Sequence, residues 1–312
     1  MIRGPAVVVF ALLTVFIATA SAQAPLQRCL GLTPTIVGTE GNDILTGTDR
    51  DDVIVGMGGD DVLNGGPESL STDLLCGGEG NDTLQAGEGL VAVMSGDGGD
   101  DKLEPGQTSL ALAAYIDSPA PVNVDLTAGT AVGWGTDSLM GIDHVIGSSF
   151  ADVLGGSEKI NVLLGFEGDD QLRGLGGGDS LTGDAGNDLL EGGTGSDEAS
   201  FDGASGVRVD LAAGTARGWG SDRLVAIERV EGSAGADAIR GNGGANVLAG
   251  LGGSDTISGF AGNDRITGGA GNDRLAGGAG GDRLDGGAGR DQGDGGPGRD
   301  RCIKIERKKR CP

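Results

Sequence analysis

The chain has 312 residues, of which 66 are glycine and only 9 are proline, and its formal net charge is −24. Glycine at about three times its ordinary usage, without matching proline, excludes collagen and proline-rich linkers, and so negative a chain is not expected to bind nucleic acid because the phosphates would be repelled. The single histidine and 3% of aromatic residues exclude sites that need two histidines and make a core of large packed side chains improbable.

Residues 1–22 have the pattern of a secretory signal peptide. A basic start at Arg3 is followed by the apolar run 6–17 and by Ala-Ser-Ala at 20–22. We predict cleavage after Ala22 and secretion; the alternative is an uncleaved membrane anchor, for which the run is short. No later segment is apolar enough for a transmembrane span. Residues 23–37 are predicted to form an N-terminal cap.

A period of nine residues begins at Gly38, with pieces such as GTEGNDILT and GGEGNDTLQ. Numbering the places of each piece from 1 to 9, place 1 is Gly, place 6 is Asp in almost every piece, and place 8 is Leu or Ile. About nineteen such pieces occur. They form three blocks, at residues 38–104, 147–200 and 232–303.

The nonapeptide can be interpreted physically. Glycines at places 1, 2 and 4 permit the positive φ of a tight turn and let carbonyl oxygens approach a small ion. Places 7–9 fit one short strand whose place-8 side chain points inward, so two pieces make an 18-residue coil and stacked coils make two parallel sheets. The predicted fold class is all-β, a right-handed parallel β-roll or β-solenoid with two wider spacer segments. The expected inward residues are Leu172, Leu181, Leu190, Ile239, Leu248, Ile257, Ile266, Leu275 and Leu284.

Rows of aspartate are expected along both edges of the stack, because turns on one edge recur every 18 residues. Unpaired carboxylates at a spacing of about 5 Å would repel one another, and carboxylate and carbonyl oxygens together suit Ca²⁺ better than Mg²⁺. The alternative is that these residues only form turns. The predicted metal ligands are Asp43, Asp52, Asp61, Asp82, Asp101, Asp170, Asp179, Asp188, Asp197, Asp255, Asp264, Asp273, Asp282, Asp291 and Asp300.

These pieces resemble the RTX nonapeptide G-G-x-G-x-D-x-U-x, in which U is apolar. The resemblance covers roughly two thirds of the mature chain, and it implies several Ca²⁺ ions held between successive turns of a parallel β-roll. The start TIVGTEGNDILTG resembles Sec-exported bacterial members of this family, whereas the basic tail KIERKKRCP departs from the RTX toxins that carry an uncleaved C-terminal signal. The glycines expected beside the ions are Gly250, Gly253, Gly259, Gly262, Gly268, Gly271, Gly277 and Gly280.

Some pieces are expected to be weaker sites. Asn161 and Asn246 replace the aspartate at place 6, with a neutral amide oxygen. Phe150 and Arg50 stand at place 4, where we expect a positive φ that would be strained for Phe150.

The spacers, residues 105–146 and 201–231, belong to a second repeat in which residues 114–156 align without gaps on residues 199–241. Alternating apolar residues in both predict strands. The expected role is to continue or cap the solenoid, as in spacers of many RTX proteins. Trp134 and Trp219 are interpreted as packing anchors, with a carbohydrate or partner surface as the alternative. A catalytic role for His144 is not expected, because it aligns with Arg229.

Four cysteines lie near the ends of the repeats. Of their three pairings, proximity favours Cys29 with Cys76 and Cys302 with Cys311. One staple at each end would protect a solenoid from fraying. Residues 304–312 are predicted to be a basic C-terminal cap on the acidic roll, with binding to an anionic surface as the alternative.

The sequence favours a secreted calcium-binding protein whose roll folds on the ion, and not an enzyme, since no G-x-S-x-G, HExxH or P-loop motif occurs. The first alternative is an adhesin or matrix protein with a cell-surface or polysaccharide partner. The second is an enzyme that acts on polysaccharides through Asp125 or Asp210.

Overall fold

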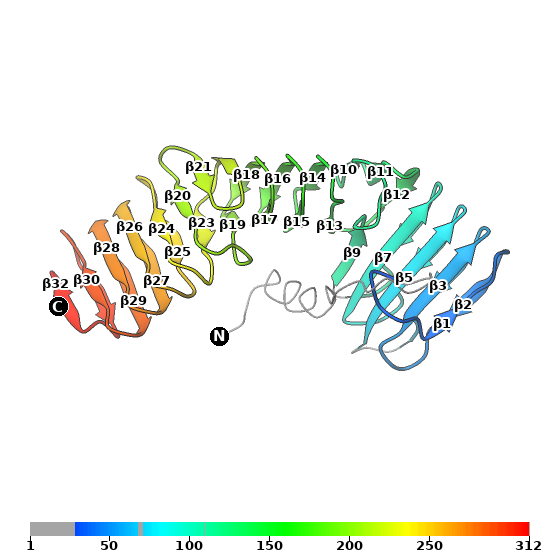
Figure 1. Ribbon diagram of the computed structural model, residues 1–312, viewed down its shortest axis with the longest axis horizontal. Coiled ribbons are helices and arrows are strands. Elements are labelled where there is room, and N and C mark those ends of the chain that lie inside the picture. Colours follow the sequence, from blue (N-terminus) through cyan, green and yellow to red (C-terminus); the bar gives the residue numbers. More distant parts are fainter. Residues whose placement is uncertain (1–28, 68–70, 109, 312) are drawn as a thin grey trace. The chain divides into compact units, whose positions relative to one another are not determined.

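The computed structural model of the protein describes residues 29–67, 71–108 and 110–311. The signal peptide predicted at residues 1–22 lies outside the described residues and stays a prediction. The chain divides into two compact units, Met1–Phe166 and Glu167–Pro312, whose strands are drawn in Figure 1. The described residues form strands and turns and no helix. Among them, therefore, there is no helix long and apolar enough to cross a membrane.

The first sheet of the first unit is entirely parallel. Most neighbouring strands are one coil apart in sequence, so that Val145 of one strand stands beside Leu163 of the next. Between β9 and β13 the separation is larger, because Ala113 pairs with Val145 across the first spacer. The strands in order are β1 (Ile36–Val37), β3 (Val53–Gly58), β5 (Thr72–Glu79), β7 (Val91–Gly98), β9 (Leu110–Ala114), β13 (His144–Ile146) and β15 (Val162–Leu164).

The second sheet of this unit begins with parallel strands and then changes. Its parallel part contains β2 (Ile44–Thr46), β4 (Val62–Asn64), β6 (Thr83–Gln85) and β8 (Lys102–Glu104). An antiparallel meander of β12 (Thr136–Ser138), β11 (Thr130–Val132) and β10 (Asn123–Asp125) follows β8, and β10 pairs in parallel with β14 (Val153–Ser157). The first predicted spacer is thus a meander inserted into a parallel sheet.

The second unit repeats this arrangement. Its first sheet is parallel and contains β17 (Ser180–Thr182), β19 (Glu198–Ser200), β23 (Arg229–Glu231), β25 (Val247–Ala249), β27 (Arg265–Ala270), β29 (Arg283–Ala288) and β31 (Arg301–Ile303). Its second sheet contains β16 (Gln171–Gly177) and β18 (Leu189–Gly195), then a meander of β22 (Ser221–Val225), β21 (Thr215–Arg217) and β20 (Arg208–Asp210).

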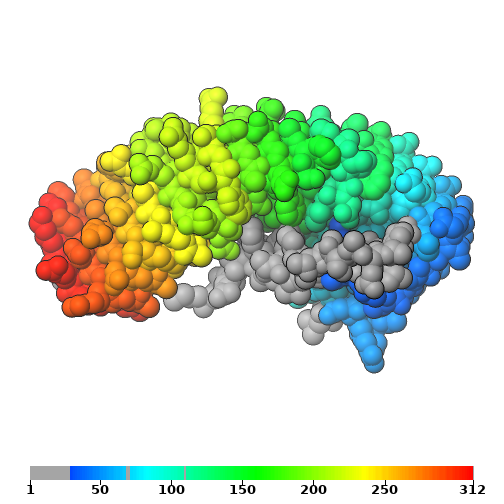
Figure 2. Space-filling view, in the orientation of Figure 1, coloured from blue at the N-terminus to red at the C-terminus, as the bar shows by residue number. Residues whose placement is uncertain are grey.

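The second sheet of this unit continues beyond the meander with β24 (Ala238–Arg240), β26 (Thr256–Ala261), β28 (Arg274–Ala279), β30 (Gln292–Asp294) and β32 (Arg307–Lys309). These strands lie side by side in Figure 1, from yellow to red. In the space-filling view the same coils pack directly against one another (Figure 2). The predicted parallel β-solenoid of stacked 18-residue coils is therefore confirmed.

A line of aliphatic side chains forms the interior between the two sheets. All nine residues predicted to point inward are buried, each with at most 3% exposure. In the last coil Gly293 occupies the inward place, and the side chain of Ile305 fills the space beside it. In the coils of residues 250–285 this line gives one buried aliphatic residue per nine, which supplies little hydrophobic stabilisation. The first unit has an additional hydrophobic cluster that includes Val55, Val93 and Leu112.

Both predicted disulfides are present. Cys29 bonds to Cys76 on β5, and Cys302 on β31 bonds to Cys311. The basic tail becomes the last strand, β32, beside β30. Arg310 donates from Nε and Nη2 to the two carboxylate oxygens of Asp294 at 2.7 and 2.6 Å, and these hydrogen bonds lower the pKa of Asp294 to about 2. The tail therefore caps the acidic roll by pairing with it.

Candidate metal-binding turns

The aspartates at place 6 form ladders along the edges of each unit. The backbone N–H of Asp255 donates to Oδ1 of Asp273, one coil further along, at 2.9 Å, and Asp273 repeats this contact with Asp291 at 2.9 Å. On the other edge Asp264 donates to Asp282, which donates to Asp300. The two predicted rows of aspartate are thus present, and the structure adds that one carboxylate oxygen of each residue builds the ladder.

The ladders include acidic residues that the nine-residue period does not reveal. After the third block, Glu306 accepts the last ladder hydrogen bond, from the N–H of Asp291. Inside the meanders, Asp137 and Asp222 accept ladder hydrogen bonds from the nonapeptide blocks that precede them. Asp73, at the end of the lengthened piece, accepts from the N–H of Asp52 at 3.0 Å. The only sequence signal for Asp137 and Asp222 is their alignment between the two spacers, because both lie outside the nonapeptides.

The predicted ligands are buried, apart from Asp43, which is half-buried. In many of them Oδ2, the carboxylate oxygen not used by the ladder, is buried and receives no hydrogen bond. A buried carboxylate without a partner is costly, so these oxygens are suited to bind a cation. They belong to Asp61, Asp82, Asp101, Asp197, Asp255, Asp264, Asp273, Asp282, Asp291 and Asp300.

Several of these oxygens lie near a backbone carbonyl oxygen of the next coil. A Cβ atom placed on Gly250 would meet both Oδ2 of Asp255 and the carbonyl oxygen of Gly268, which belongs to the next coil. Gly259 stands in the same relation to Asp264 and Gly277. Glycine at place 1 is therefore required by close approach, and not by the positive φ expected from the sequence, because place 1 of these turns is absent from the left-handed region.

Places 2 and 4 do have a positive φ. At place 4, φ is 96° at Gly253, 111° at Gly262, 140° at Gly271 and 143° at Gly280. At place 2 several turns carry a side chain in this region, among them Met57, Leu175, Leu251 and Phe260, with φ from 68° to 86°. A left-handed conformation costs such residues about 1–2 kcal/mol each, so these turns contain strain that something bound in them would have to offset.

The pKa values of the ladder carboxyls reflect this environment. Burial, with the neighbouring carboxylates Asp237 and Asp273, raises the pKa of Asp255 to about 7. Burial also raises the pKa of Asp101 to about 7 and that of Asp264 to about 6. Without a cation these turns hold protons more tightly than free aspartate does.

A second kind of turn supplies its own donors. In the piece that begins at Gly47, the backbone N–H and the hydroxyl of Thr48 both donate to Oδ2 of Asp52, at 2.6 and 2.8 Å. Burial alone would raise the pKa of Asp52, but the hydrogen bonds from Thr48 and Thr35 outweigh it and lower the pKa. We call a turn capped when the N–H of place 2 donates to the side chain of place 6, and open when φ at place 2 is positive.

Among the residues that the structure describes, six pieces have capped turns. The pairs are Thr39 with Asp43, Thr48 with Asp52, Ser148 with Asp152, Ser157 with Asn161, Ser233 with Asp237, and Asn242 with Asn246. Neither Phe150 nor Arg50, both at place 4 of capped turns, has a positive φ. The strain expected for Phe150 is therefore wrong, because a capped turn does not use the left-handed conformation at place 4.

The donor set of the open turns suits Ca²⁺. No group of three or more His, Cys, Asp or Glu side chains within reach of one metal ion occurs in the part of the chain that the structure describes. The oxygens that converge are single carboxylate oxygens and backbone carbonyls. Ca²⁺ accepts six to eight such ligands in flexible geometry, so the residues present fit this ion.

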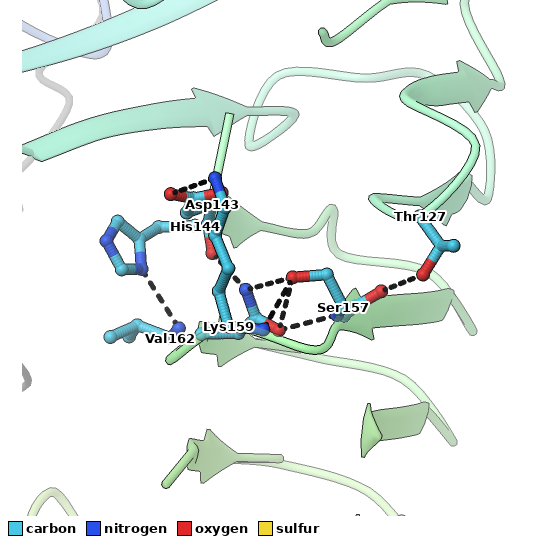
Figure 3. A network of polar contacts seen from close by, with 8 residues as sticks. Thr127, Asp143, His144, Ser157, Lys159 and Val162 are labelled. Carbon is cyan, nitrogen blue, oxygen red and sulfur yellow. Dashed lines mark hydrogen bonds and ion pairs between the residues drawn. The ribbon is translucent and has the colours of Figure 1, made fainter. Parts of the chain in front are cut away.

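His144 takes part in a structural network (Figure 3). Its Nδ1 accepts a hydrogen bond from the N–H of Val162 at 3.1 Å, and burial lowers its pKa to about 4. Nearby, Ser157 caps Asn161, and Lys159 forms an ion pair with Asp143 at 2.9 Å. His144 thus links its strand to the neighbouring strand β15.

The spacer residues considered for other functions have local contacts. Oδ1 of Asp125 accepts from the N–H of Ala128 at 2.9 Å, and Asp210 accepts from Ala213 at 3.0 Å. Both aspartates therefore stabilise the turns that follow β10 and β20. The ring of Trp219 lies over Gly203, although 43% of the residue is exposed.

Fold and turns together define a parallel β-solenoid with acidic, glycine-rich turns. The family model of the RTX calcium-binding nonapeptide repeat, in four copies, matches residues 37–68, 71–89, 164–199, 218–257, 240–275, 258–293 and 267–302. These matches cover more than half of the 312 residues, and the chain belongs to this family. A search of the curated proteins gives no match.

Proposed function

We propose that the open turns bind several Ca²⁺ ions and that binding drives the folding of a secreted β-roll. The observation that carries the proposal is the buried Oδ2 of residues such as Asp255 and Asp273, which receives no hydrogen bond and faces carbonyl oxygens. The ion would neutralise these carboxylates and stabilise the left-handed turns. Without it, repulsion along the ladders would expand the chain, so folding and binding are coupled.

The proposed setting is extracellular, with a structural or interaction role and no catalysis. The predicted signal peptide and the two disulfides suit export to an oxidising compartment. Sites in extracellular modules bind Ca²⁺ at about 10⁻⁴–10⁻³ M.

Far-UV circular dichroism of residues 23–312 tests the proposal. After chelation, we expect the β signal to return at submillimolar to millimolar Ca²⁺ and not with Mg²⁺. A chain that is equally rich in β structure with chelator and with Ca²⁺ would overturn it.

A pair of variants makes this test specific. Asp273→Asn keeps an oxygen to accept the N–H of Asp255 but removes the charge of an open turn. We expect about a tenfold loss of Ca²⁺ affinity, equivalent to about 1.4 kcal/mol. The control is Asp43→Asn in a capped turn, where Thr39 already donates to the carboxylate. Equal losses in the two variants would contradict the assignment of the ion to open turns.

A further inference from the structure

We propose that each nonapeptide block opens with one coil that folds without calcium, and that the residue at place 2 decides whether a turn needs the ion. This inference rests on the proposed function of the open turns. It divides the predicted ligands into two classes, with Asp43 and Asp52 assigned to the class that binds no ion.

In the capped turns, hydrogen-bond donors satisfy the carboxylate oxygens that an ion would otherwise bind. The backbone N–H of Ser148 donates to Oδ2 of Asp152 at 2.6 Å, and its hydroxyl donates to Oδ1 at 2.8 Å. The N–H and the hydroxyl of Ser233 donate in the same way to Oδ2 and Oδ1 of Asp237, both at 2.7 Å. Both oxygens of each carboxylate therefore have donors, and no buried oxygen is left for a cation to satisfy.

Asparagine at place 6 supports the same interpretation. Oδ1 of Asn161 accepts the N–H of Ser157 at 2.6 Å, and its Nδ2 donates to the carbonyl of Asp143 at 2.7 Å. An amide that donates to a carbonyl removes that oxygen from the set available to an ion. Both place-6 asparagines, Asn161 and Asn246, occur in capped turns.

The capped turns occur in pairs at the start of every block. They fall in the pieces that begin at Gly38 and Gly47, at Gly147 and Gly156, and at Gly232 and Gly241. Two consecutive pieces make one coil with one turn on each edge, so each pair is a complete capped coil. The later pieces with glycine or a bulky residue at place 2, such as Gly269 or Phe260, have positive φ there.

In the first and third blocks, backbone N–H groups of the capped coil donate to the place-6 carboxylates of the open coil that follows. The backbone N–H of Asp237 donates to Oδ1 of Asp255 at 2.9 Å, and that of Asn246 donates to Asp264 at 2.8 Å. In the first block Asp43 donates to Asp61 at 2.7 Å. A capped coil that persists without calcium would therefore orient the first open carboxylates before an ion arrives.

Hydrogen exchange measured by mass spectrometry on residues 23–312 in chelator tests the proposal directly. We expect amides of the capped coils, at residues 36–55, 144–164 and 229–249, to exchange at least tenfold more slowly than amides at residues 268–303. With Ca²⁺ the two groups should become similar. Equal exchange of both groups in chelator would overturn the proposal.

A gain of capping offers a second test at one coil. The double variant Leu251→Ser/Phe260→Ser gives the coil 250–267 the place-2 residue of capped turns. We expect its Ca²⁺ stoichiometry, measured by titration calorimetry, to fall by at least one ion. The matched control Leu251→Gly/Phe260→Gly carries the place-2 residue of open turns and should keep the stoichiometry of the unaltered chain.

The two proposals fail in different ways. If the unaltered chain binds no Ca²⁺, the proposed function fails. If it binds Ca²⁺ but the serine and glycine variants have the same stoichiometry, the function stands and the role of place 2 is wrong.

Discussion

The coil at residues 38–55 and the coil at residues 268–285 are built from the same nonapeptide but are held together differently. In the first, Thr39 and Thr48 donate to the carboxylates at place 6. In the second, the turns are left-handed at Gly269 and Gly278 and leave buried carboxylate oxygens without donors. The aspartate ladders are alike in both. The two kinds of turn thus differ in the conformation and hydrogen bonds of place 2, within a repeat that forms the same coil.

Removal of the disulfide Cys29–Cys76 is expected to have the largest effect on stability, and to act on the first capped coil alone. This disulfide closes a loop with a sequence separation of 47. A loop of that size contributes about 4 kcal/mol in the chain-entropy model. Cys29→Ser/Cys76→Ser should therefore lower the free energy of unfolding of the first unit, measured with denaturant. In chelator it should speed exchange at residues 36–55 but leave residues 229–249 unchanged. Faster exchange in both coils would show that they do not fold independently.

A glycine pair at place 4 should give the next largest effect. In an open turn, Gly271 has φ of 140°, and a Cβ there would strike the carbonyl of Gly253. Gly271→Ala should therefore cost about 2 kcal/mol or more with Ca²⁺ present. In a capped turn, Gly41 has no positive φ and nothing lies within 4 Å of a Cβ placed on it. Gly41→Ala should leave the melting temperature within a few degrees. Similar losses would mean that the two turns share one conformation.

A smaller effect is expected from pH, which changes the stability of the open turns in the unaltered chain. The pKa of Asp255 is raised from 3.8 to about 7 by burial and by nearby carboxylates. A carboxyl with a raised pKa in the folded state stabilises that state fully below about pH 4, and this contribution is lost as the pH rises towards 7. In chelator, acidification from pH 7 to pH 5 should therefore restore part of the β signal in circular dichroism.

The pH experiment has a counterpart with the ion present. Because protons and Ca²⁺ compete for the same carboxylates, Ca²⁺ affinity should fall as the pH is lowered from 7 to 5. An affinity that does not change between pH 7 and pH 5 would contradict the assignment of Asp255 and its neighbours as ligands.

Much of the fold could be predicted because the period of the repeat determines where strands and turns lie. A period of nine with Leu or Ile at place 8 places one strand per piece, and two pieces close a coil. The inward positions of Leu172 and Ile266 followed from this period, and the pairing of Cys302 with Cys311 followed from their proximity in the sequence.

The turn classes were not predicted, although their signal is in the sequence. Thr48 and Ser148 stand at place 2, where a hydroxyl beside an aspartate four residues later can cap the turn. The expectation that every turn has a positive φ at place 4 assigned strain to Phe150. Asp137 could not be found from the period because a meander separates it by 36 residues from Asp101, the residue that donates to it.

The two meanders have a consequence for how such a chain grows. Each is followed by a capped coil, and residues 114–156, which contain the first meander, align with residues 199–241 at an offset of 85 residues. A duplicated segment of this length carries its own starting coil and its own sheet insertion. The number of such segments can therefore change while each copy keeps its own capped coil. The segment is for the same reason suited to use as a unit in engineered repeat proteins.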